Sequence, residues 1–443
     1  MATRLGAMDI PMASDRRTTT MPTSPSAVNL PLSKYRNFNA VLGSAAVSSL
    51  GDGVRLAALP LLVVTITSDP VAVSGVAIAN RLPWIFVALF SGAIADRYRR
   101  RTLIIVVDAA RATVVLALAA LIFLHADTLT MVYVVAVGLG IGETLFDSAS
   151  QGFLPDLVPA EHLSRANSRL FTVRMVGSNF LGPTIGSWLF GISRMVPFIA
   201  DSISFAVGSM LVGTVKNQET HQPQGKRKSL LHDVRAGISW LWRHPLIRSF
   251  AIVVTLVNFT QSASQSLLVL LAVDDLGISK NAYGLLLTAG GVGGFIGGML
   301  SPRIGDRLGV PYILWPAIAL TCPLFFVMAW TRQPVMLGAA LASNAFLGIL
   351  ANVQMISLRQ RLVPRNYLGR VGSVNQFLSF GLAIPIGALA AGLLAHWTSV
   401  RTVYLAAAVA VLVLSLGVMR QMRPAAIKQA IAEVENEPAG ESY

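Results

Sequence analysis

Charged residues are scarce in this sequence, and cysteine is almost absent. Asp, Glu, Lys and Arg together make up 13% of the 443 residues, about half of the roughly 25% usual in soluble domains. Hydrophobic residues account for 54%, and the mean hydropathy is +0.63. A soluble fold of this size could not hide so much apolar surface from water, so the composition indicates a protein embedded in lipid. The single cysteine, Cys322, excludes an intramolecular disulfide.

Sequence motifs of enzymes and nucleotide-driven pumps are also missing. The chain has no Gly-x-x-x-x-Gly-Lys-Ser/Thr phosphate loop, which argues against ATP as an energy source. It contains neither a Cys/His cluster with metal-ligand spacing nor a Gly-x-Ser-x-Gly nucleophile elbow. We therefore expect no enzymatic activity, no metal and no cofactor.

Long apolar stretches are the main feature that the sequence does have. A helix needs about 20 mostly apolar residues to cross the hydrocarbon core of a bilayer, and twelve stretches fit that requirement. Prolines inside several of them are tolerable, because neighbouring helices can satisfy the freed backbone groups. The membrane spans are expected at residues 39–66, 72–95, 102–124, 130–152, 166–191, 196–215, 248–272, 281–301, 311–330, 334–358, 371–395 and 400–419.

Lys and Arg are distributed unevenly between the two sides that these spans define. Only Arg194, Lys280, Arg332 and Arg401 fall in loops on one side, whereas most of the 35 basic residues fall on the other. Cytoplasmic loops carry the excess of Lys and Arg, so both termini are expected in the cytoplasm and the chain in the cytoplasmic membrane. The net charge of +14 then reflects this bias rather than a binding surface for nucleic acid.

The longest connection between spans divides them six and six. Its second part is amphipathic and is expected to lie on the cytoplasmic lipid surface, with a plain linker as the alternative. The expected segments are a disordered cytoplasmic tail at 1–33, a six-helix bundle at 34–215, the linker at 216–247, a second six-helix bundle at 248–420 and a cytoplasmic tail at 421–443.

The two halves of the chain repeat each other. Residues 157–168 and 362–373 are identical at half of their twelve positions, and each copy joins a fourth span to a fifth. Asp96-Arg97 and Asp306-Arg307 recur at nearly the same offset, each between a second and a third span. Two related six-helix halves with a site at their interface are typical of secondary transporters.

Three motifs resemble those of the major facilitator superfamily. The run from Gly92 through Asp96, Arg97, Arg100 and Arg101 is similar to the superfamily motif Gly-x-x-x-Asp-Arg-x-Gly-Arg-Lys/Arg, and Asp306 and Arg307 belong to a partial second copy. The run containing Gly177, Gly182, Pro183 and Gly186 resembles the Gly-Pro motif of drug–proton antiporters. Gly51-Asp52-Gly53, with the run after span four, is similar to the enterobactin-exporter and macrolide-efflux branch.

This resemblance covers about residues 35–420. It implies an all-α membrane protein with twelve transmembrane helices in two pseudo-symmetric six-helix bundles, the major facilitator fold. It also implies that the Asp96–Arg101 loop latches one conformational state.

Charged residues inside the expected spans are confined almost wholly to the first half. Each costs about 2.5–3.5 kcal/mol on insertion scales and therefore needs a reason. Glu143 and Asp147 are four residues apart on one helical face, and their mutual repulsion favours proton uptake and release. Arg174 could neutralise one of them, and a static Glu143–Arg174 bridge is the alternative. Asp52 and Arg55, three residues apart, form either a local ion pair or a titrating site.

Two further pairs of charged positions have other expected roles. Asp108 and Arg111 are expected to belong to the gate at the Asp96–Arg101 loop. Arg81 and Asp201 lie toward the outer ends of their spans and are expected to extend to the membrane surface.

The expected spans of the second half contain no Asp or Glu. They offer uncharged polar residues instead, which either line a substrate cavity or form hydrogen bonds between helices. The cavity candidates are Asn258, Gln261, Gln265, Asn344 and Asn375.

These features predict a secondary active transporter. We expect it to export amphipathic small molecules, such as drugs or a siderophore-like metabolite, by proton antiport and alternating access. Its partners are then a small-molecule substrate, protons and the lipid bilayer, with a monomer as the unit. A proton-coupled or facilitative importer of a small nutrient is the alternative, and a non-transporting membrane receptor or scaffold is a third possibility.

Overall fold

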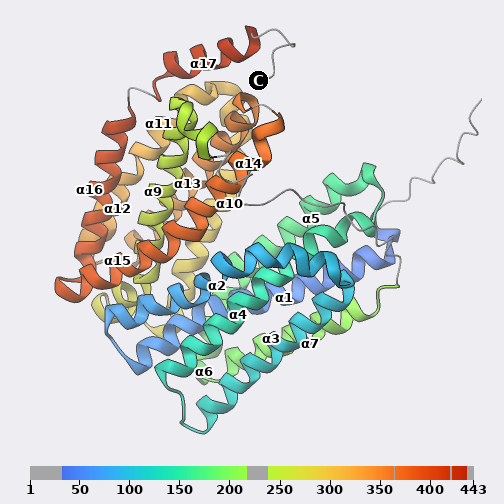
Figure 1. Ribbon diagram of the computed structural model, residues 1–443. Helices are drawn as coiled ribbons and strands as arrows, with labels where there is room; N and C mark the ends of the chain where they lie inside the picture. The colour runs from blue at the N-terminus through green and yellow to red at the C-terminus, as the bar shows by residue number, and fades with distance from the viewer. Residues whose placement is uncertain (1–31, 217–237, 364, 420–421, 437–443) are drawn as a thin grey trace, which may run out of the picture.

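The structure is a computed structural model that describes residues 32–216, 238–363, 365–419 and 422–436 (Figure 1). Within these residues the chain forms helices and connections and no strand. The expected all-α fold is thereby confirmed. The expected N-terminal tail and most of the 216–247 linker, including its amphipathic stretch, lie outside the described residues.

The first half forms six membrane-spanning helical elements, separated by short connections. Asp69 caps the second of them by accepting a hydrogen bond from the Val71 backbone N–H, and Pro70 fits its first turn. The elements are η1 (Leu32–Lys34), α1 (Arg36–Ile66), α2 (Pro70–Arg97), α3 (Arg100–Phe123), α4 (Leu129–Phe153), η2 (Leu154–Asp156), η3 (Ala160–His162), α5 (Leu163–Met175), η4 (Val176–Leu181), α6 (Gly182–Ile192) and α7 (Val196–Gly213).

The second half also forms six spanning elements, although the third of them is divided into two helices. Its elements are α9 (Pro245–Ser266), η5 (Leu270–Asp275), α10 (Lys280–Leu308), α11 (Val310–Ala319), α12 (Thr321–Trp330), α13 (Pro334–Leu362), α14 (Arg365–Gln376), η6 (Phe377–Leu382), α15 (Ala383–Trp397) and α16 (Val400–Val418), followed by α17 (Pro424–Asn436).

The observed spans agree with the expected ones, apart from three differences. Eleven helical segments of the described chain are long and apolar enough to cross a membrane. The fifth expected span is not among them, and α5, η4 and α6 follow one another there. Helix α10 continues to Leu308, so Asp306 and Arg307 lie in its last turn rather than in a loop. The expected C-terminal tail contains α17, whose Lys428 donates a hydrogen bond to the Tyr312 hydroxyl.

A π-helical turn interrupts the fifth spanning helix of each half. It occupies Val176–Leu181 as η4 in the first half and Phe377–Leu382 as η6 in the second. Such turns are rare and are often found at functional sites. Their matched placement extends the internal repeat from sequence to backbone geometry.

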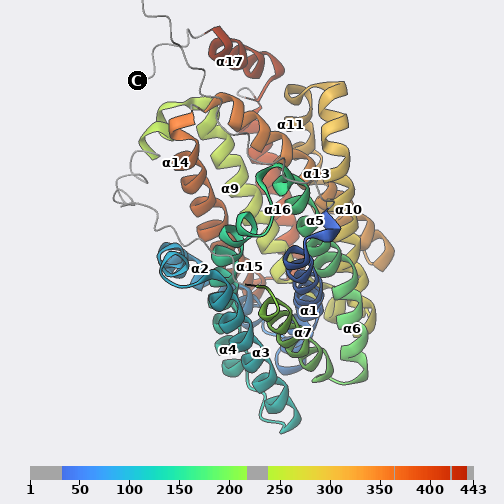
Figure 2. The same ribbon diagram turned by 90° about the vertical axis from the view of Figure 1, so that its right-hand side faces the viewer.

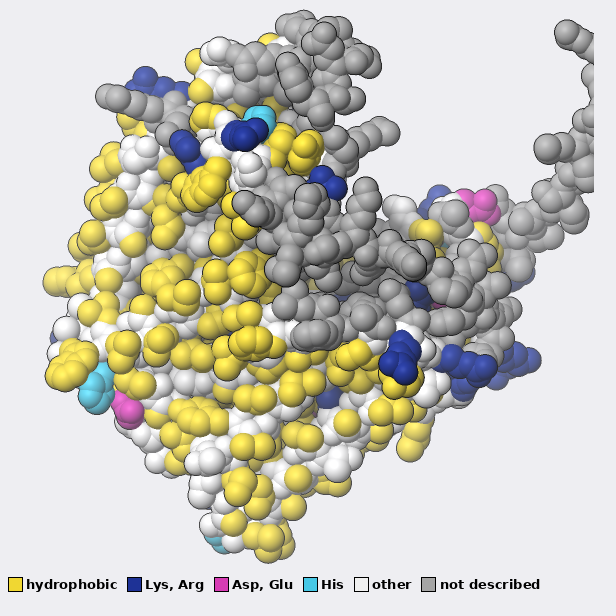
Figure 3. All heavy atoms as spheres, viewed as in Figure 1, with side chains coloured by type: hydrophobic (Ala, Val, Ile, Leu, Met, Phe, Trp, Pro, Cys, Tyr) yellow, Lys and Arg dark blue, Asp and Glu magenta, His cyan; other side chains and the backbone are white. Residues whose placement is uncertain are grey.

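Hydrophobic side chains cover the surface that would face lipid. Figure 3 shows them across both halves, with Lys and Arg gathered toward the edges of the molecule. Large apolar residues such as Phe86, Met210 and Trp330 are exposed on these helices. A multi-pass membrane protein requires this distribution, since lipid replaces water around the apolar belt.

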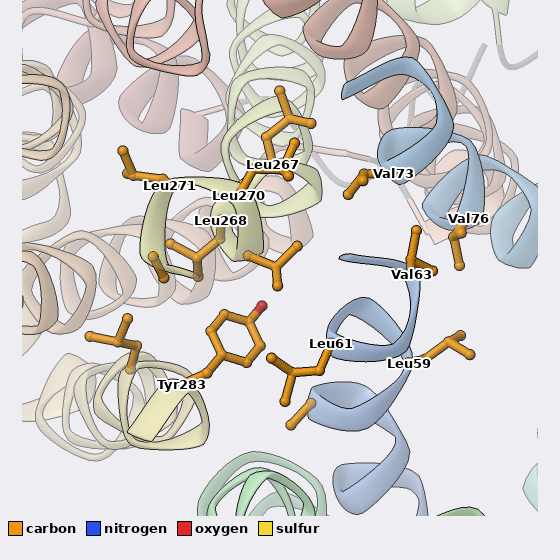
Figure 4. Close-up of a cluster of buried hydrophobic side chains, with 14 of the residues drawn as sticks. Leu59, Leu61, Val63, Val73, Val76, Leu267, Leu268, Leu270, Leu271 and Tyr283 are labelled. Atoms are coloured by element: carbon orange, nitrogen blue, oxygen red, sulfur yellow. The ribbon is translucent and has the colours of Figure 1, made fainter. Parts of the chain in front are cut away.

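Buried apolar residues form three clusters that differ in which half supplies them. We name the side of the molecule that carries the α2–α3 connection the basic side, and the other the opposite side. One cluster lies toward the opposite side and contains residues of both halves (Figure 4). There Leu61 of α1 lies beside Tyr283 of α10, and the same cluster contains Leu267 and Leu271 of the second half.

The other two clusters lie toward the basic side, and each belongs to one half. One contains residues 32–215 only, and the other residues 241–427 only. The halves therefore share a core on the opposite side and have separate cores on the basic side, and their ribbons diverge in the same way (Figures 1 and 2). The two halves thus pack together on the opposite side and lie apart on the basic side.

Candidate transport site

The interior of the first half contains a network of five charged side chains from three helices. Arg55 of α1 contacts Asp52 at 2.5 Å and Asp201 of α7 at 2.9 Å. Arg111 of α3 contacts Asp52 at 2.9 Å and lies 3.5 Å from Asp108. The Arg111 guanidinium also lies over the Phe205 ring, 4.0 Å from its centroid. Charges taken out of water need such partners.

One expectation about these residues is wrong. Asp201 does not extend to the membrane surface: its side chain is fully buried against Arg55. Arg111 joins Asp108 to Asp52 inside the bundle, and the role of this pair in the gate stays a prediction. The sequence signal for Asp201 is its position as a lone acid inside an apolar span, which demands a basic partner on another helix.

A second pair of contacts lies on α4. Glu143 is 3.6 Å from Arg81 of α2, and Asp147 is 3.9 Å from Arg174 of α5. The alternative Glu143–Arg174 bridge is therefore absent, and Arg81 has a partner that the sequence did not indicate. These four side chains are 38–52% exposed, so the two carboxylates are far more accessible than Asp108 or Asp201.

The two sets of charges act on each other. Asp147 interacts electrostatically with Glu143, Arg111 and Asp52 as well as with Arg174. A proton gained or lost on α4 therefore changes the field at the buried network, because charges in a poorly solvated interior are weakly screened.

Glycines let α1 approach the fifth spanning helix closely beside Asp52. A Cβ at Gly53 would lie 2.6 Å from the Gly177 carbonyl oxygen, and one at Gly182 would lie 2.5 Å from the Gly53 Cα. A Cβ at Gly186 would collide with the Val54 backbone in the same way. Gly53 and the glycines of the Gly-Pro motif thus form one close contact between α1 and the fifth spanning helix, which small residues make possible.

Pro183 of this motif also faces the second half. A Cβ at Gly284 of α10 would collide with the Pro183 carbonyl oxygen, and Thr288 donates a hydrogen bond to the Phe180 carbonyl oxygen at 2.8 Å. Helix α2 meets α15 at the equivalent place, where Gly392 packs against Pro70. These inter-half contacts involve the ends of the helices that lie toward the opposite side.

The residues of the expected gate lie on the basic side. Arg100 donates hydrogen bonds to the Gly152 carbonyl oxygen at 2.6 Å and to Asp156 at 3.2 Å, and Arg101 donates to the carbonyl oxygens of Val212 and Gly213. They fasten the start of α3 to the ends of α4 and α7.

The remaining gate residues occupy helix ends. Gly92, Asp96 and Arg97 fall in the last turns of α2, and Asp306 and Arg307 in the last turn of α10. Arg97, Asp306 and Arg307 are exposed.

Most of the expected cavity residues line one of two cavities. One of about 370 Å³ lies between the halves and is lined by Leu56, Asn179 and Pro183 of the first half and Gln265 of the second, among others. The other, of about 290 Å³, lies within the second half and is lined by Asn258, Gln261 and Asn344. Asn375 lines a separate space of about 30 Å³.

A helical membrane protein whose two six-helix halves meet around a cavity has the architecture of a secondary transporter. The sequence profile of the transmembrane secretion effector family matches residues 28–439. The chain belongs to this family of the major facilitator superfamily, and it is a transporter rather than an enzyme.

Relatives with similar sequences include efflux proteins. The chain is 25% identical to an uncharacterized MFS-type transporter (YfiS) of Bacillus subtilis over 382 residues, which are 82% of this chain and 88% of that protein. It is 24% identical to the multidrug efflux pump Tap of Mycolicibacterium fortuitum, over 85% and 93% of the two chains. It is 22% identical to macrolide efflux protein A of Streptococcus pyogenes, over 83% and 93%.

Solved structures with the same fold include a nucleoside transporter and a ferroportin homologue. A point mutant of the nucleoside transporter NupG superposes with a TM-score of 0.72 at 12% identity, covering 87% of this chain and 99% of that one. A bacterial homologue of the iron transporter ferroportin in its inward-facing state gives 0.66 at 18% identity, covering 88% and 99%. These similarities show the fold.

Proposed function

We propose that the protein exports amphipathic small molecules across the cytoplasmic membrane in exchange for protons. In this proposal the basic side and both termini face the cytoplasm, and a single chain is the working unit because it supplies both halves of the site. The excess of Lys and Arg on the basic side supports the orientation. The printed names of two relatives, a multidrug pump and a macrolide efflux protein, support export.

The observation that carries the coupling is a charge imbalance in the first half. Its interior contacts join the carboxylates of Asp52, Asp108, Glu143, Asp147 and Asp201 to the guanidiniums of Arg55, Arg81, Arg111 and Arg174. With every group ionised, one negative charge is in excess. A charge without a partner is costly in a poorly solvated interior, so we expect these five carboxylates to bind one proton when the site is closed to water.

Glu143 and Asp147 are the proposed exchange sites for that proton. Their contacts with guanidinium groups are the long ones, 3.6 and 3.9 Å, and both carboxylates are accessible to water. Asp52 is the third candidate, but two guanidiniums hold it within 2.9 Å. A proton that reaches α4 weakens the attraction of Glu143 for Arg81 or of Asp147 for Arg174. The released guanidinium can then donate hydrogen bonds to a substrate.

Alternating access then requires the halves to separate on the opposite side and to come into contact on the basic side. The present state is closed where α6 packs on α10 and α2 on α15. The proposed second state opens these contacts and brings the Arg97 and Arg307 ends of α2 and α10 together on the basic side. The Asp96–Arg101 motif is proposed to latch that closure.

Transport into everted membrane vesicles tests the proposal. A panel of amphipathic fluorescent dyes is offered to vesicles with an imposed pH gradient, acidic inside. We expect accumulation that collapses when the gradient is dissipated, and loss of gradient dependence in a Glu143→Gln/Asp147→Asn double variant. Asp274→Asn, an exposed acid at the end of η5, is the matched control. Accumulation that ignores the gradient, or normal coupling in the double variant, contradicts proton exchange.

A further inference from the structure

The structure assigns a second binding site, separate from the charged interior of the first half. We propose that the cavity of about 290 Å³ within the second half binds an uncharged amphipathic group: a ring or branched chain that bears a hydrogen-bond acceptor for Asn344. The cavity is enclosed by α9, α11, α12, α13, η6 and α16. The proposal deepens the export function, since it states what part of a substrate the second half would take.

The residues that line this cavity disfavour a charged ligand. None of the described residues that line it is ionisable; they are aliphatic and aromatic side chains such as Val257, Phe325 and Met355, with a few amides and two threonines. A ligand with a formal charge would lose its water there and find no counter-ion, which is costly. A neutral group loses little and gains apolar contact.

The threonine hydroxyls are already engaged. Thr260 donates to the Leu256 and Val257 carbonyl oxygens, and Thr321 donates to the Ile318 carbonyl oxygen. The side chains left to bind a ligand through hydrogen bonds are therefore the amides.

Asn344 is the amide that most needs a partner. It is 4% exposed, and its Nδ2 has no hydrogen-bond partner in the described part of the chain. A buried donor without an acceptor is destabilising, so an acceptor carried by a ligand would satisfy it. A carbonyl, ether or hydroxyl oxygen in an otherwise apolar group meets this need.

The size and position of the cavity indicate how much of a substrate it holds. A volume of 290 Å³ lies at the lower edge of the roughly 300–1,000 Å³ typical of pockets for drug-sized ligands. It shares Ala345 and Ile349 with the cavity between the halves. A larger molecule can thus place one neutral arm beside Asn344 while its remainder faces the charged first half.

Two glycines allow each cavity to be filled separately. Gly348 lines the cavity of the second half and Gly290 the cavity between the halves, and a Cβ at either would meet no atom within 4 Å. Gly348→Leu and Gly290→Leu therefore occupy one cavity each without displacing backbone. Gly417 of α16 has the same open surroundings outside both cavities, so Gly417→Leu controls for the added side chain.

Binding to the full chain in lipid nanodiscs, with no gradient, tests the site. The probe is 6-propionyl-2-dimethylaminonaphthalene, a neutral fluorophore with one carbonyl, and its analogue with a propyl group in place of the propionyl lacks the acceptor. Empty nanodiscs give the background from lipid. We expect Gly348→Leu to weaken binding of the carbonyl probe more than tenfold, and Gly290→Leu and Gly417→Leu to retain it.

Asn344→Leu provides a second, independent variant. It should weaken the carbonyl probe about tenfold, which corresponds to about 1.4 kcal/mol, and leave the propyl analogue unchanged. Undiminished binding in Gly348→Leu, or equal losses for both probes in Asn344→Leu, overturns the proposal. Because no proton gradient is applied, a protein that passes this test and fails the vesicle assay loses the export function and keeps the site.

Discussion

The first six spanning helices and the last six share a π-helical turn in the fifth of each, yet their interiors differ. In the first half, α1, α3 and α7 are joined by a network of guanidiniums and carboxylates. In the second half, most described contacts between spanning helices are apolar or use neutral groups, such as Gln354 bonded to Ser301. Its ion pair between Arg401 and Asp275 lies at the ends of α16 and η5.

The same six-helix fold thus holds a network of paired charges in one half and an apolar cavity in the other. Charges that must stay paired fix the relative positions of the helices that carry them, because moving one helix would leave a buried ion alone. A cavity lined by no ionisable group can instead stay apolar, since no ion has to be neutralised there. The two halves share their helix arrangement and differ in the polar side chains of their interiors.

The largest expected effect comes from breaking the charged network. Arg111→Ala removes the guanidinium that contacts Asp52 and Asp108 and leaves Asp108, which is fully buried, without a partner. Loss of one member of a buried pair typically costs about 3–5 kcal/mol. We expect a sharp fall in thermal stability and in monodisperse yield in detergent. Arg169→Ala, at an exposed position of α5, is the control, and equal stability of the two variants would contradict the network's role.

Much of this architecture could be predicted from the sequence because membrane burial acts locally. Apolar length fixed the spans to within a few residues, and contacts at a spacing of three residues on one helix, Asp52–Arg55 and Asp108–Arg111, follow from the helical repeat. The repeat of Asp96-Arg97 in Asp306-Arg307 indicated two related halves.

The cross-helix partners could not be predicted, since they depend on how each helix is rotated in the bundle. Arg55–Asp201 and Arg81–Glu143 join residues whose separation in the chain carries no geometric information. The same holds for the cavity beside Asn344, which five spanning helices enclose together. The π-helical turns were missed because an apolar run predicts a helix without indicating where its hydrogen-bond spacing changes.

The second largest effect is expected at the contact between α6 of the first half and α10 of the second. A side chain at Gly284 would meet the Pro183 carbonyl oxygen, so Gly284→Ala should force α10 from α6 and destabilise the present state by about 1–3 kcal/mol, the usual cost of overpacking. Spin labels at Ser164→Cys and Ser373→Cys, with Cys322→Ser, report the width of the basic side. We expect a shorter distance than in the unmodified state.

Gly290→Ala is the control for that measurement, because the same helix has open space at Gly290. An unchanged distance in Gly284→Ala, with the protein folded, would show that the α6–α10 contact does not determine which side is open.

The loss of stability on removing a neutral hydrogen-bonding group from the second half can be compared with the loss in Arg111→Ala. Gln354→Leu in α13 removes hydrogen bonds of 2.7 and 2.9 Å to Ser301 of α10 and leaves that serine's polar groups without this donor. The expected loss is about 1–2 kcal/mol, smaller than for Arg111→Ala because no charge is left unpaired. Thermal unfolding under identical conditions checks the order. A larger loss for Gln354→Leu would contradict the view that charge makes the first half the more constrained one.

The smallest effect is expected where the halves meet through Asp69 and His396. Their side chains lie 3.1 Å apart at the opposite side and are 42% and 51% exposed, and such surface pairs contribute about 0–1 kcal/mol. Partial burial raises the pKa of Asp69, but hydrogen bonds from His396 and from the backbone N–H groups of Val71 and Ala72 outweigh it and leave the pKa below its usual value. The carboxylate's contribution to closure is therefore complete above the usual pKa and is lost as pH falls through the lowered one.

His396→Ala removes this inter-half contact alone, so the labelled basic side should spend less time open, by at most about fivefold in the ratio of states. The control is Arg194→Ala, which removes a pair with Asp127 on the same side of the membrane but within the first half. Because Arg194–Asp127 does not join the halves, its loss should leave the label distances unchanged. A shift in both variants would mean that charge on this surface, rather than the contact between the halves, sets the equilibrium.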